Sequence, residues 1–292
     1  MNLNSKLLTL NSLPPVAEMM RAAGLEPKKQ LGQNFLFDLN LTGKIASKVP
    51  NIENTTVIEI GPGPGGLTRA LLLAGARKVI AIEKDKTCKP ILDQITAAAD
   101  GRLEVVFADA LKLLSVGGLL GKNRREGFAI CSNLPYNIGT ELLVRWLHDT
   151  ENISSMTLMF QKEVALRIVA APGTEHYGRL SVLTALTAKA KILFDVPNTA
   201  FVPRPKVQSA VVQIIPKSQI ANCKPVSAQR SADGSQIANI EKLTAKLFGQ
   251  RRKMIRSILP GVDWTAFNLS GTERAENLSP EKFAEIASKI VV

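Results

Sequence analysis

Cysteine, histidine and aromatic residues are scarce in this chain. Its 292 residues include three cysteines and two histidines, and aromatic residues make up 5% of it. Cys88, Cys131 and Cys223 lie far apart without a CxxC pair, and only His148 and His176 add imidazole groups. A zinc site or a disulfide framework is therefore not expected, and no metal is predicted. So few cysteines are typical of proteins from a reducing cytoplasm.

Long apolar runs are also missing. The apolar stretch near the N-terminus is Leu7-Leu8, which Thr9 and Asn11 interrupt. A signal peptide or a membrane span needs a longer run, and no other segment approaches that length. We therefore expect a cytoplasmic protein without a membrane partner.

Basic charge is what the chain has in excess. Its formal net charge is +12 and its isoelectric point is about 9.7. Such a charge suits a polyanionic partner, either nucleic acid or an anionic membrane surface, although it can also serve solubility alone. Basic residues cluster near the C-terminus, which favours nucleic acid. The length allows one large domain or two ordinary ones.

Strand-like and helix-like segments alternate from residue 38 to residue 170. The expected strands are Thr56–Ile60, Lys78–Ile82, Leu103–Phe107, Phe128–Ser132 and Met156–Phe160. The expected helices are Asp38–Val49, Gly66–Ala74, Pro90–Ala98, Glu141–Leu147 and Glu163–Ala170. Short apolar strands that alternate with helices predict a parallel sheet covered on both faces.

The alternation ends after residue 170. Lys191–Asp195 and Val207–Ile215 are expected to form a hairpin-like addition at the sheet edge, joined by the proline-rich connection Val196–Pro205. The following segment, Pro216–Ala238, is polar and lacks periodicity, which indicates a linker or a mobile loop.

The C-terminal residues Ile240–Val292 are predicted to form a small helical module. A helix over Glu241–Leu259 would place Arg252 and Arg256 opposite an apolar face. That face comprises Leu243, Leu247, Met254 and Ile258. The cationic face suits phosphate groups, although a solvated surface helix gives the same pattern. Gly249 disfavours one unbroken helix.

These segments predict an α/β protein with a Rossmann-like sheet and a small all-α C-terminal domain. The expected division is residues 1–216, with 1–24 as an N-terminal extension, and residues 217–292. Residues 1 to about 20 are expected to be poorly ordered, with a short helix over Val16–Ala23 after Pro14-Pro15.

The turn after the first strand of the alternating region is rich in glycine. Gly61, Gly63 and Gly66 fit the G-x-G-x-x-G spacing, which suits NAD, FAD or S-adenosylmethionine, or a simple tight turn. The turn sits where a parallel sheet opens a crevice. Glu59 beside it would favour a sulfonium cation over a pyrophosphate, or would orient backbone amides of the loop. The acid favours S-adenosylmethionine.

Two further acids follow expected strands. Glu83 ends the next strand about 20 residues beyond the glycines, where an acid binds ribose hydroxyls. Asp109 ends the third strand, where a carboxylate can accept a hydrogen bond from an adenine amino group. Capping of the following turn explains Asp109 equally well.

The run Asn133-Leu134-Pro135-Tyr136 follows a buried strand and is the most informative motif. The amide oxygen of Asn133 and the carbonyl oxygen of Leu134 can accept hydrogen bonds from an exocyclic amine, and Tyr136 offers a stacking face. The motif therefore suits a planar base with an amino group. A plain turn would also account for the spacing.

In combination, these motifs resemble one family over Leu25 to the C-terminus. They stand in the order Gln33–Leu36, Glu59–Gly63, Leu67-Thr68, Glu83, Asp109, Asn133–Tyr136, Phe201–Val207 and Gln250–Lys253. The chain resembles the bacterial small-subunit rRNA adenine dimethyltransferases of the KsgA/RsmA type. These are relatives of the erythromycin-resistance methylases and the mitochondrial transcription factor B proteins.

The resemblance implies a role for each matched position. It places S-adenosylmethionine, the methyl donor, against Asn34, Leu36, Glu59, Gly61, Gly63, Glu83, Asp109 and Asn133. It makes Asn133, Leu134, Tyr136 and Phe201 the catalytic group, with both aromatic rings stacking on a flipped-out base. Phe201 as ordinary edge packing is the competing interpretation. RNA contacts are expected from Lys28, Lys29, Arg251, Arg252, Lys253 and Arg256.

The resemblance implies a monomeric enzyme that methylates N6 of two adjacent adenines in the 3′-terminal hairpin of 16S rRNA, twice each, in the small ribosomal subunit precursor. The segments Lys112–Glu126 and Pro216–Ala238 depart from the family pattern. The alternatives are a 23S rRNA methylase of the erythromycin-resistance type, a DNA adenine methylase, a non-catalytic assembly or transcription factor, and an NAD-dependent oxidoreductase.

Overall fold

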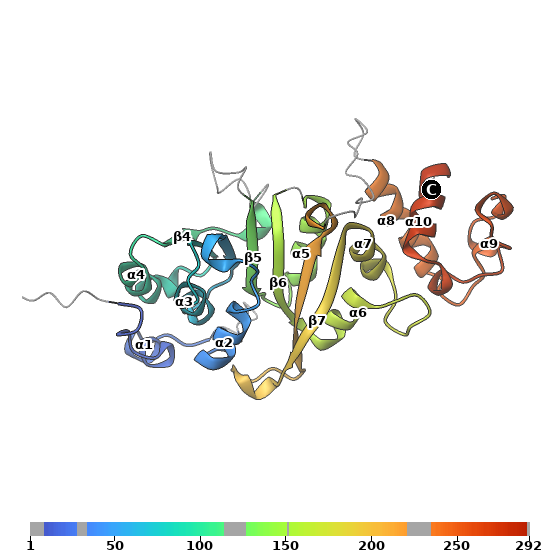
Figure 1. The fold of residues 1–292 in the computed structure, drawn as a ribbon. Coiled ribbons are helices and arrows are strands. Elements are labelled where there is room, and N and C mark those ends of the chain that lie inside the picture. Colours follow the sequence, from blue (N-terminus) through green and yellow to red (C-terminus); the bar gives the residue numbers. More distant parts are fainter. Residues whose placement is uncertain (1–8, 28–33, 114–126, 151, 221–234, 291–292) are drawn as a thin grey trace, which may run out of the picture. The chain divides into compact units, whose positions relative to one another are not determined.

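The structure, a computed structural model, describes residues 9–27, 34–113, 127–150, 152–220 and 235–290 (Figure 1). Lys28, Lys29 and most of the segments 112–126 and 216–238 lie outside these ranges. The described residues form two compact units. The first lies within Met1–Leu142, Asn152–Lys162 and Leu193–Gln213, and the second within Leu143–Glu151, Glu163–Ile192 and Ile214–Val292. The predicted boundary after residue 216 stays a prediction.

A seven-stranded sheet has the strand order β4-β3-β2-β5-β6-β9-β7. The strands are β2 (Thr56–Ile60), β3 (Lys78–Glu83), β4 (Leu103–Phe107), β5 (Phe128–Asn133), β6 (Ile153–Gln161), β7 (Ala188–Val196) and β9 (Ser209–Pro216). β2 pairs in parallel with both β3 and β5. β3 and β4 therefore extend the sheet on one side of β2, and β5 and β6 extend it on the other. A crevice therefore opens beyond the carboxyl ends of β2 and β5. The predicted parallel pairing of the five strands β2 to β6 is confirmed.

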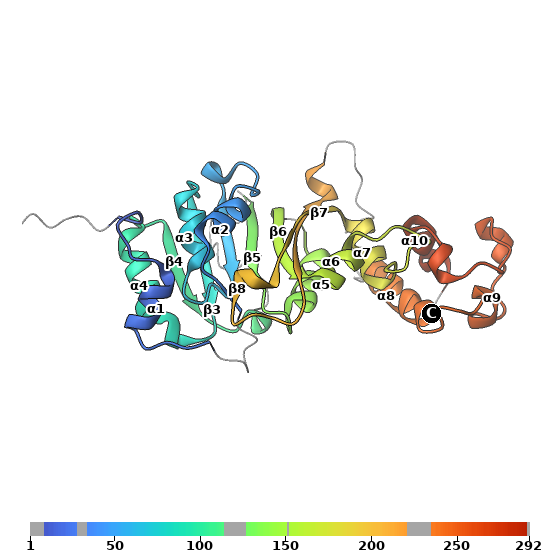
Figure 2. The same cartoon turned by 90° about the horizontal axis from the view of Figure 1, so that it is seen from below.

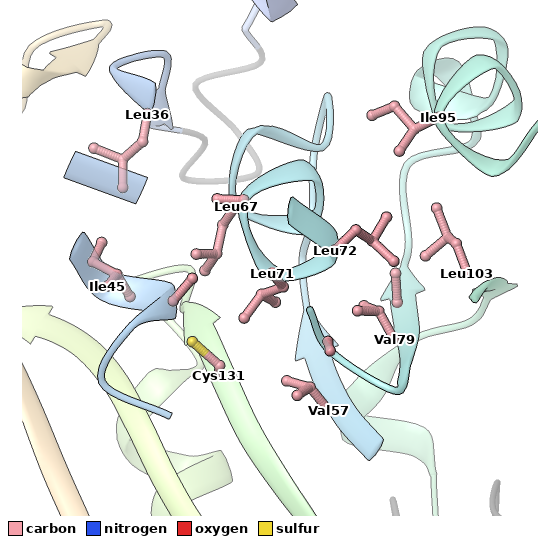
Figure 3. Packing of buried hydrophobic residues seen from close by; sticks show 14 of the residues in the cluster. Leu36, Ile45, Val57, Leu67, Leu71, Leu72, Val79, Ile95, Leu103 and Cys131 are labelled. Atoms are coloured by element: carbon pink, nitrogen blue, oxygen red, sulfur yellow. The ribbon is translucent and has the colours of Figure 1, made fainter. Parts of the chain in front are cut away.

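Helices pack on this sheet through apolar residues. The helices of the alternating region are α2 (Leu39–Ala46), α3 (Gly66–Leu73), α4 (Lys89–Ala98), α5 (Gly139–His148) and α6 (Lys162–Val169). Leu67, Leu71 and Leu72 of α3 are buried beside Val57 and Val79 (Figure 3). Burying one such leucine contributes about 1.5–3 kcal/mol, so this packing fixes the start of α3 under the glycine turn.

The N-terminal segment is more ordered than the sequence suggested. α1 spans Val16–Ala22, as expected, but Leu10 and Leu13 before it are also buried in the core of the first unit. Arg69 of α3 donates to the carbonyl oxygens of Leu13 and Pro14 over 2.9 and 2.7 Å. The expectation of poor order is therefore wrong for residues 9–20, because a buried arginine on a distant helix holds them.

The predicted hairpin-like addition at the sheet edge is confirmed, since β9 and β7 are neighbours at one end of the strand order. β9 lies between β6 and β7, so β7 is the sheet edge. The backbone N–H of Lys162 donates to the carbonyl of Gln208 over 2.9 Å, which places the start of β9 beside the end of β6. A two-residue strand, β8 (Phe201–Val202), pairs antiparallel with β1 (Phe35–Leu36).

The helical unit contains α7 (Arg179–Thr187), α8 (Ser235–Phe248), α9 (Ile255–Ile258) and α10 (Pro280–Lys289). α8 and α10 lie side by side in both views (Figure 2). The predicted continuous helix over Glu241–Leu259 is wrong. α8 ends at Phe248, and Met254 forms a bridge with Arg274 instead of continuing the helix. A side chain at Gly249 would lie 2.9 Å from the carbonyl oxygen of Ala245.

Candidate active site

A cavity of about 220 Å³ lies at the carboxyl edge of the sheet, within the first unit. Residues that follow β2, β3, β4 and β5 line it, together with the segment 34–36. Ten predicted positions contribute to the lining: Asn34, Leu36, Glu59, Gly61, Gly63, Glu83, Asp109, Asn133, Leu134 and Tyr136. The fold thus brings together residues that are widely separated in sequence.

The glycine turn is shaped by close approaches that exclude side chains. Gly63 has φ 54°, and a Cβ there would lie 2.6 Å from Cε1 of Phe35. A Cβ on Gly66 would lie 2.4 Å from the carbonyl oxygen of Leu36. These distances are too short for any real contact, so the segment 34–36 can close over the turn only because glycines stand there. The cradle fits a ligand held by backbone, as the predicted donor site requires.

Glu59 is buried under the turn and accepts a hydrogen bond from the Thr68 hydroxyl over 2.6 Å. Burial raises the pKa of Glu59 to about 8, against the lowering effect of the Thr68 hydrogen bond, and the nearby Glu83 raises it further. The carboxyl is therefore largely neutral near pH 7 in this structure. Thr68 is a residue of α3, so this hydrogen bond joins Glu59 to the helix. It does not orient a backbone amide of the loop, which was one of the two roles predicted from the sequence.

Glu83 anchors the glycine turn from the neighbouring strand. Its two carboxylate oxygens accept from the backbone N–H groups of Gly63, over 2.9 Å, and Asp85, over 2.7 Å. Burial raises the pKa of Glu83, although these backbone donors partly oppose the rise. Each carboxylate oxygen has two acceptor positions, so the group can also accept from a hydroxyl such as that of ribose.

Asp109 caps a short turn, which is one of the two roles that the sequence left open, and it also lines the cavity. Its Oδ1 accepts from the Leu111 backbone N–H over 3.1 Å and so caps a short turn. Its Oδ2 lies 2.9 Å from Nζ of Lys84, and the hydrogen bond from Lys84 lowers the pKa of Asp109. Lys84 also lines the cavity and was not predicted as a site residue. Its position directly after Glu83 was the available signal.

The side-chain amide of Asn133 has a defined orientation. Its Nδ2 donates to the backbone carbonyl oxygen of Asn34 over 3.0 Å. Because the nitrogen is engaged, Oδ1 is the atom that the side chain presents as an acceptor. Pro135 of the same motif packs on the glycine turn, since a Cβ on Gly61 would lie 3.3 Å from its ring. The loops after β2 and β5 are thus in direct contact.

The two predicted aromatic residues differ in their surroundings. Tyr136 lines the cavity, and its hydroxyl lies 2.7 Å from Oγ of Ser209 at the start of β9. Burial raises the pKa of Tyr136, so the phenol is neutral at physiological pH. Phe201 is 2% exposed, lies in the core cluster with Leu36, and is not among the lining residues. Its role in stacking stays a prediction.

The predicted RNA-binding residues of the helical unit are not equivalent. Arg252, Lys253 and Arg256 are exposed. Arg251 is half-buried and donates to the Glu276 carboxylate over 2.6 Å and to the carbonyls of Glu175 and Thr174 over 2.8 and 3.2 Å. It therefore connects three segments of the unit. Lys28 and Lys29 lie outside the described residues.

Neither membrane nor metal features emerge from the described part of the chain. Within those residues no helix combines the length and apolarity of a transmembrane helix. Nor does the same part of the chain hold three histidine, cysteine, aspartate or glutamate residues grouped closely enough for a metal ion.

The fold and the cavity define a class. The protein has the features of an S-adenosylmethionine-dependent methyltransferase: a Rossmann-like sheet, a glycine turn after β2, and acids at the ends of β3 and β4. Within this class, the chain belongs to the ribosomal RNA adenine dimethylase family, whose sequence model matches residues 24–291. The predicted family and enzyme type, an rRNA adenine dimethyltransferase that uses S-adenosylmethionine, are confirmed.

Similar sequences and solved structures agree. Proteins named ribosomal RNA small subunit methyltransferase A from Chelativorans sp. (strain BNC1) and Agrobacterium fabrum are 47% and 46% identical, and each match covers 97% of this chain. The matches cover 100% and 99% of those relatives.

Two crystal structures share the fold. A dimethyladenosine transferase from Plasmodium falciparum matches with a TM-score of 0.69 and 24% identity over 86% of this chain and 95% of that one. The 23S rRNA methyltransferase ErmE matches with a TM-score of 0.63 and 25% identity over 87% of this chain and 98% of that one. The predicted fold class is confirmed.

Proposed function

We propose that this enzyme transfers methyl groups from S-adenosylmethionine to N6 of two adjacent adenines in the 3′-terminal hairpin of 16S rRNA, during biogenesis of the small ribosomal subunit. The observation that carries the proposal is the fixed Asn133 amide, whose Oδ1 is presented as an acceptor while Nδ2 is held by Asn34. An acceptor at this position suits an exocyclic amine and would be unsuitable for a carbonyl group.

The amide and the adjacent carbonyl prepare the amine for attack. Adenine N6 is a weak nucleophile because its lone pair is delocalised into the ring. Hydrogen bonds from the two N6 hydrogens to Asn133 Oδ1 and the Leu134 carbonyl favour a pyramidal nitrogen with a localised lone pair. Holding that nitrogen in line with the donor supplies much of the remaining acceleration. Tyr136 holds the base by stacking, which contributes about 1–3 kcal/mol.

The lining acids and the glycine turn are assigned to the donor. Glu83 would accept from the ribose hydroxyls, Asp109 from the adenine amino group, and the Gly61–Gly63 backbone would lie along the molecule. Asn34, Leu36 and Glu59 complete the site. When bound, S-adenosylmethionine supplies an electrophilic methyl group on a sulfonium. We assign no step to a metal ion.

The second methylation differs from the first in its hydrogen bonding. The transfer leaves a cationic methylated nitrogen, and loss of one of its two protons to solvent gives a neutral amine with a single hydrogen. One of the two acceptors is then left without its donor. The target pocket must also accommodate the first methyl group. The base reaches the pocket only when it leaves its stack, which costs a few kcal/mol.

The remaining assignments concern the RNA and the cell. Arg252, Lys253 and Arg256 bind rRNA phosphates, with Lys28, Lys29 and Arg251 as further predicted contacts. Residues 217–292, predicted to be a linker and a small helical domain, serve as the RNA-binding domain of a cytoplasmic monomer. The small subunit is favoured as the substrate because the relatives at 46–47% identity carry that name, whereas the 23S enzyme ErmE is 25% identical.

Methylation of defined substrates tests this function. Purified enzyme and isotopically labelled donor are incubated separately with unmodified small subunits, large subunits and duplex DNA. Mass spectrometry of nuclease fragments should find dimethyladenine in the 3′-terminal fragment of 16S rRNA. Label confined to 23S rRNA or to DNA would replace the proposal by one of those alternatives. Binding without label would favour a non-catalytic factor.

A further inference from the structure

The hydroxyl pair formed by Tyr136 and Ser209 is unusual in its position. Ser209 is fully buried, with 0% exposure, at the start of a sheet strand. Its Oγ lies 2.7 Å from the phenol oxygen of Tyr136, which is 73 residues away in sequence. A buried serine hydroxyl needs a hydrogen-bond partner, and here that partner is a side chain from the cavity lining.

The start of β9 is held in place by the neighbouring strand. The Lys162 backbone N–H, just after β6, donates to the carbonyl of Gln208 over 2.9 Å. Ser209 follows at once, so its side chain has little freedom relative to the carboxyl edge of the sheet. β6 in turn pairs with β5 next to the target motif, as Asn133 faces Met159 in the ladder. The serine therefore belongs to the same rigid frame as Asn133.

The phenol hydroxyl gives the tyrosine ring a second fixed point. The first is the backbone of the Asn133–Tyr136 motif, and the hydroxyl lies at the opposite end of the ring. A ring attached at both ends cannot swing about its side-chain torsions without breaking the 2.7 Å hydrogen bond. The hydrogen bond lies at the edge of the ring and therefore covers neither of its faces.

We propose that Ser209 is a positioning residue for the target base, because it fixes the plane of the Tyr136 ring on which the extruded adenine stacks. This inference rests on the proposed function of Tyr136. It assigns to β9, which was expected only as an addition to the sheet edge, a direct part in the placement of the RNA substrate. It also explains a tyrosine at position 136, since a phenylalanine would lack the anchoring hydroxyl.

A double-mutant cycle tests the coupling of the two hydroxyls. The variants are Ser209→Ala, Tyr136→Phe and the double variant, with Thr157→Val as the control. Thr157 is also a buried hydroxyl of this sheet, and its hydrogen bond, to the Lys48 carbonyl over 3.4 Å, lies outside the cavity lining. For each protein, kcat and KM for RNA, the Kd for donor and the thermal midpoint are measured.

Each single variant should lower kcat/KM for RNA by about 3- to 10-fold, which is the effect expected of one neutral hydrogen bond. The double variant should be no worse than either single one, because both substitutions remove the same hydrogen bond. Donor Kd should stay within about twofold of the wild-type value, and Thr157→Val should keep wild-type kcat/KM. A general decrease in stability would change donor binding and the thermal midpoint as well.

Three results would overturn the proposal: full kcat/KM in Ser209→Ala, effects that multiply in the double variant, or a donor Kd that weakens as much as kcat/KM. If Ser209→Ala does not fold, Tyr136→Phe alone decides, since it leaves β9 intact and must show the decrease. The wild-type substrate assay separates this test from the proposed function. Activity on another RNA would refute the assigned substrate, while the cycle could still be measured on that RNA.

Discussion

The amide nitrogen of Asn133 is hydrogen-bonded to the backbone carbonyl of Asn34 over 3.0 Å, across 99 positions of sequence. Asn34 belongs to the segment that closes over the glycine turn, and Asn133 belongs to the motif assigned to the target base. One hydrogen bond therefore links the donor side of the cavity to the target side. It also leaves Oδ1 as the end of the Asn133 amide that is presented as an acceptor.

This hydrogen bond predicts different behaviour from two substitutions at position 133. Asn133→Ala removes the acceptor and should lower kcat by about 100-fold or more, as removal of a preorganised polar group does elsewhere. Asn133→Asp keeps an acceptor but cannot donate to the Asn34 carbonyl, and its charge faces that oxygen. It should lower kcat by a similar factor and also weaken donor binding. Methyl transfer to small subunits and donor affinity by calorimetry measure the two effects.

Asn54→Ala provides the control for these variants. Asn54 is exposed, and its amide donates to the nearby Asn51 side chain over 2.9 Å, so its removal should leave the rate unchanged. Full methylation by Asn133→Ala would refute the assignment of the amide as the acceptor for N6.

Glu59 predicts a stability that declines with rising pH. Its pKa is raised from 4.5 to about 8 in the folded protein, chiefly by burial. The folded state therefore binds the proton more tightly than the unfolded state, and the stabilisation is complete below pH 4.5 and disappears as pH rises towards 8. Each pKa unit corresponds to about 1.4 kcal/mol, so the effect amounts to a few kcal/mol.

Glu59→Gln isolates this contribution. Glutamine retains an oxygen that can accept from Thr68 but carries no charge. Without donor, the free energy of unfolding in urea should fall more steeply between pH 5 and 8 for the wild-type protein than for the variant. Glu83 and Cys131, whose pKa values burial also raises, titrate in both proteins, so the difference between the two curves reports Glu59 together with its Coulomb interactions with these two groups. Parallel curves would show that Glu59 does not hold its proton.

Lys84 predicts an effect on donor binding at acid pH. Its hydrogen bond to Asp109 lowers the pKa of that carboxyl, so the acceptor proposed for the donor's adenine amine stays ionised as pH falls. In Lys84→Met the pKa of Asp109 returns towards its ordinary value. Donor affinity should then weaken at a higher pH than in the wild-type protein, by about 2-fold near pH 3.8, the ordinary pKa of an aspartate, and hardly at all at pH 7.

Lys78→Met is a matched control for Lys84→Met. Lys78 forms an ion pair with Glu104 between the same two strands, β3 and β4, but neither residue lines the cavity. Its removal should leave donor affinity unchanged at every pH. The interpretation fails if the two variants give the same pH profile.

Local sequence patterns were sufficient to predict residues that line the cavity at the ends of β2, β3 and β4. The glycine turn, Glu83 and Asp109 each sit at the end of a strand, and short apolar runs identify those strands. The hydrogen bonds that orient the target side were not predictable in this way. The partners of Asn133 and Tyr136 are Asn34 and Ser209, which come close only once the sheet has formed.

Helix α7 is a second feature that local sequence patterns did not predict. It was not predicted because residues on all its sides are buried, among them Leu180, Val182 and Thr184, so the sequence has no amphipathic stripe. Part of it packs in the core of the helical unit with Tyr177. A tertiary core can thus specify a helix whose own periodicity gives no signal.

In the basic run 251–253 of the helical unit, tertiary contacts again distinguish residues that the sequence alone does not. The sequence treats Arg251 and Arg252 alike, yet Arg251 is engaged with Glu276 and with the carbonyls of Glu175 and Thr174. Arg251→Ala should therefore lower the thermal midpoint, since it leaves three acceptors without their donor. Arg252→Ala should leave the midpoint unchanged.

RNA binding, unlike the thermal midpoint, should depend more on the exposed basic residues than on Arg251. Arg252→Ala, Lys253→Ala and Arg256→Ala, combined, should weaken binding to small-subunit RNA and reduce the slope of log Kd against log salt by about 1 for each phosphate group that is no longer bound. Lys242→Ala removes an exposed cation from α8 and serves as the control. Binding whose salt dependence is the same in the triple variant and in the wild-type protein would mean that these side chains do not touch the phosphate backbone.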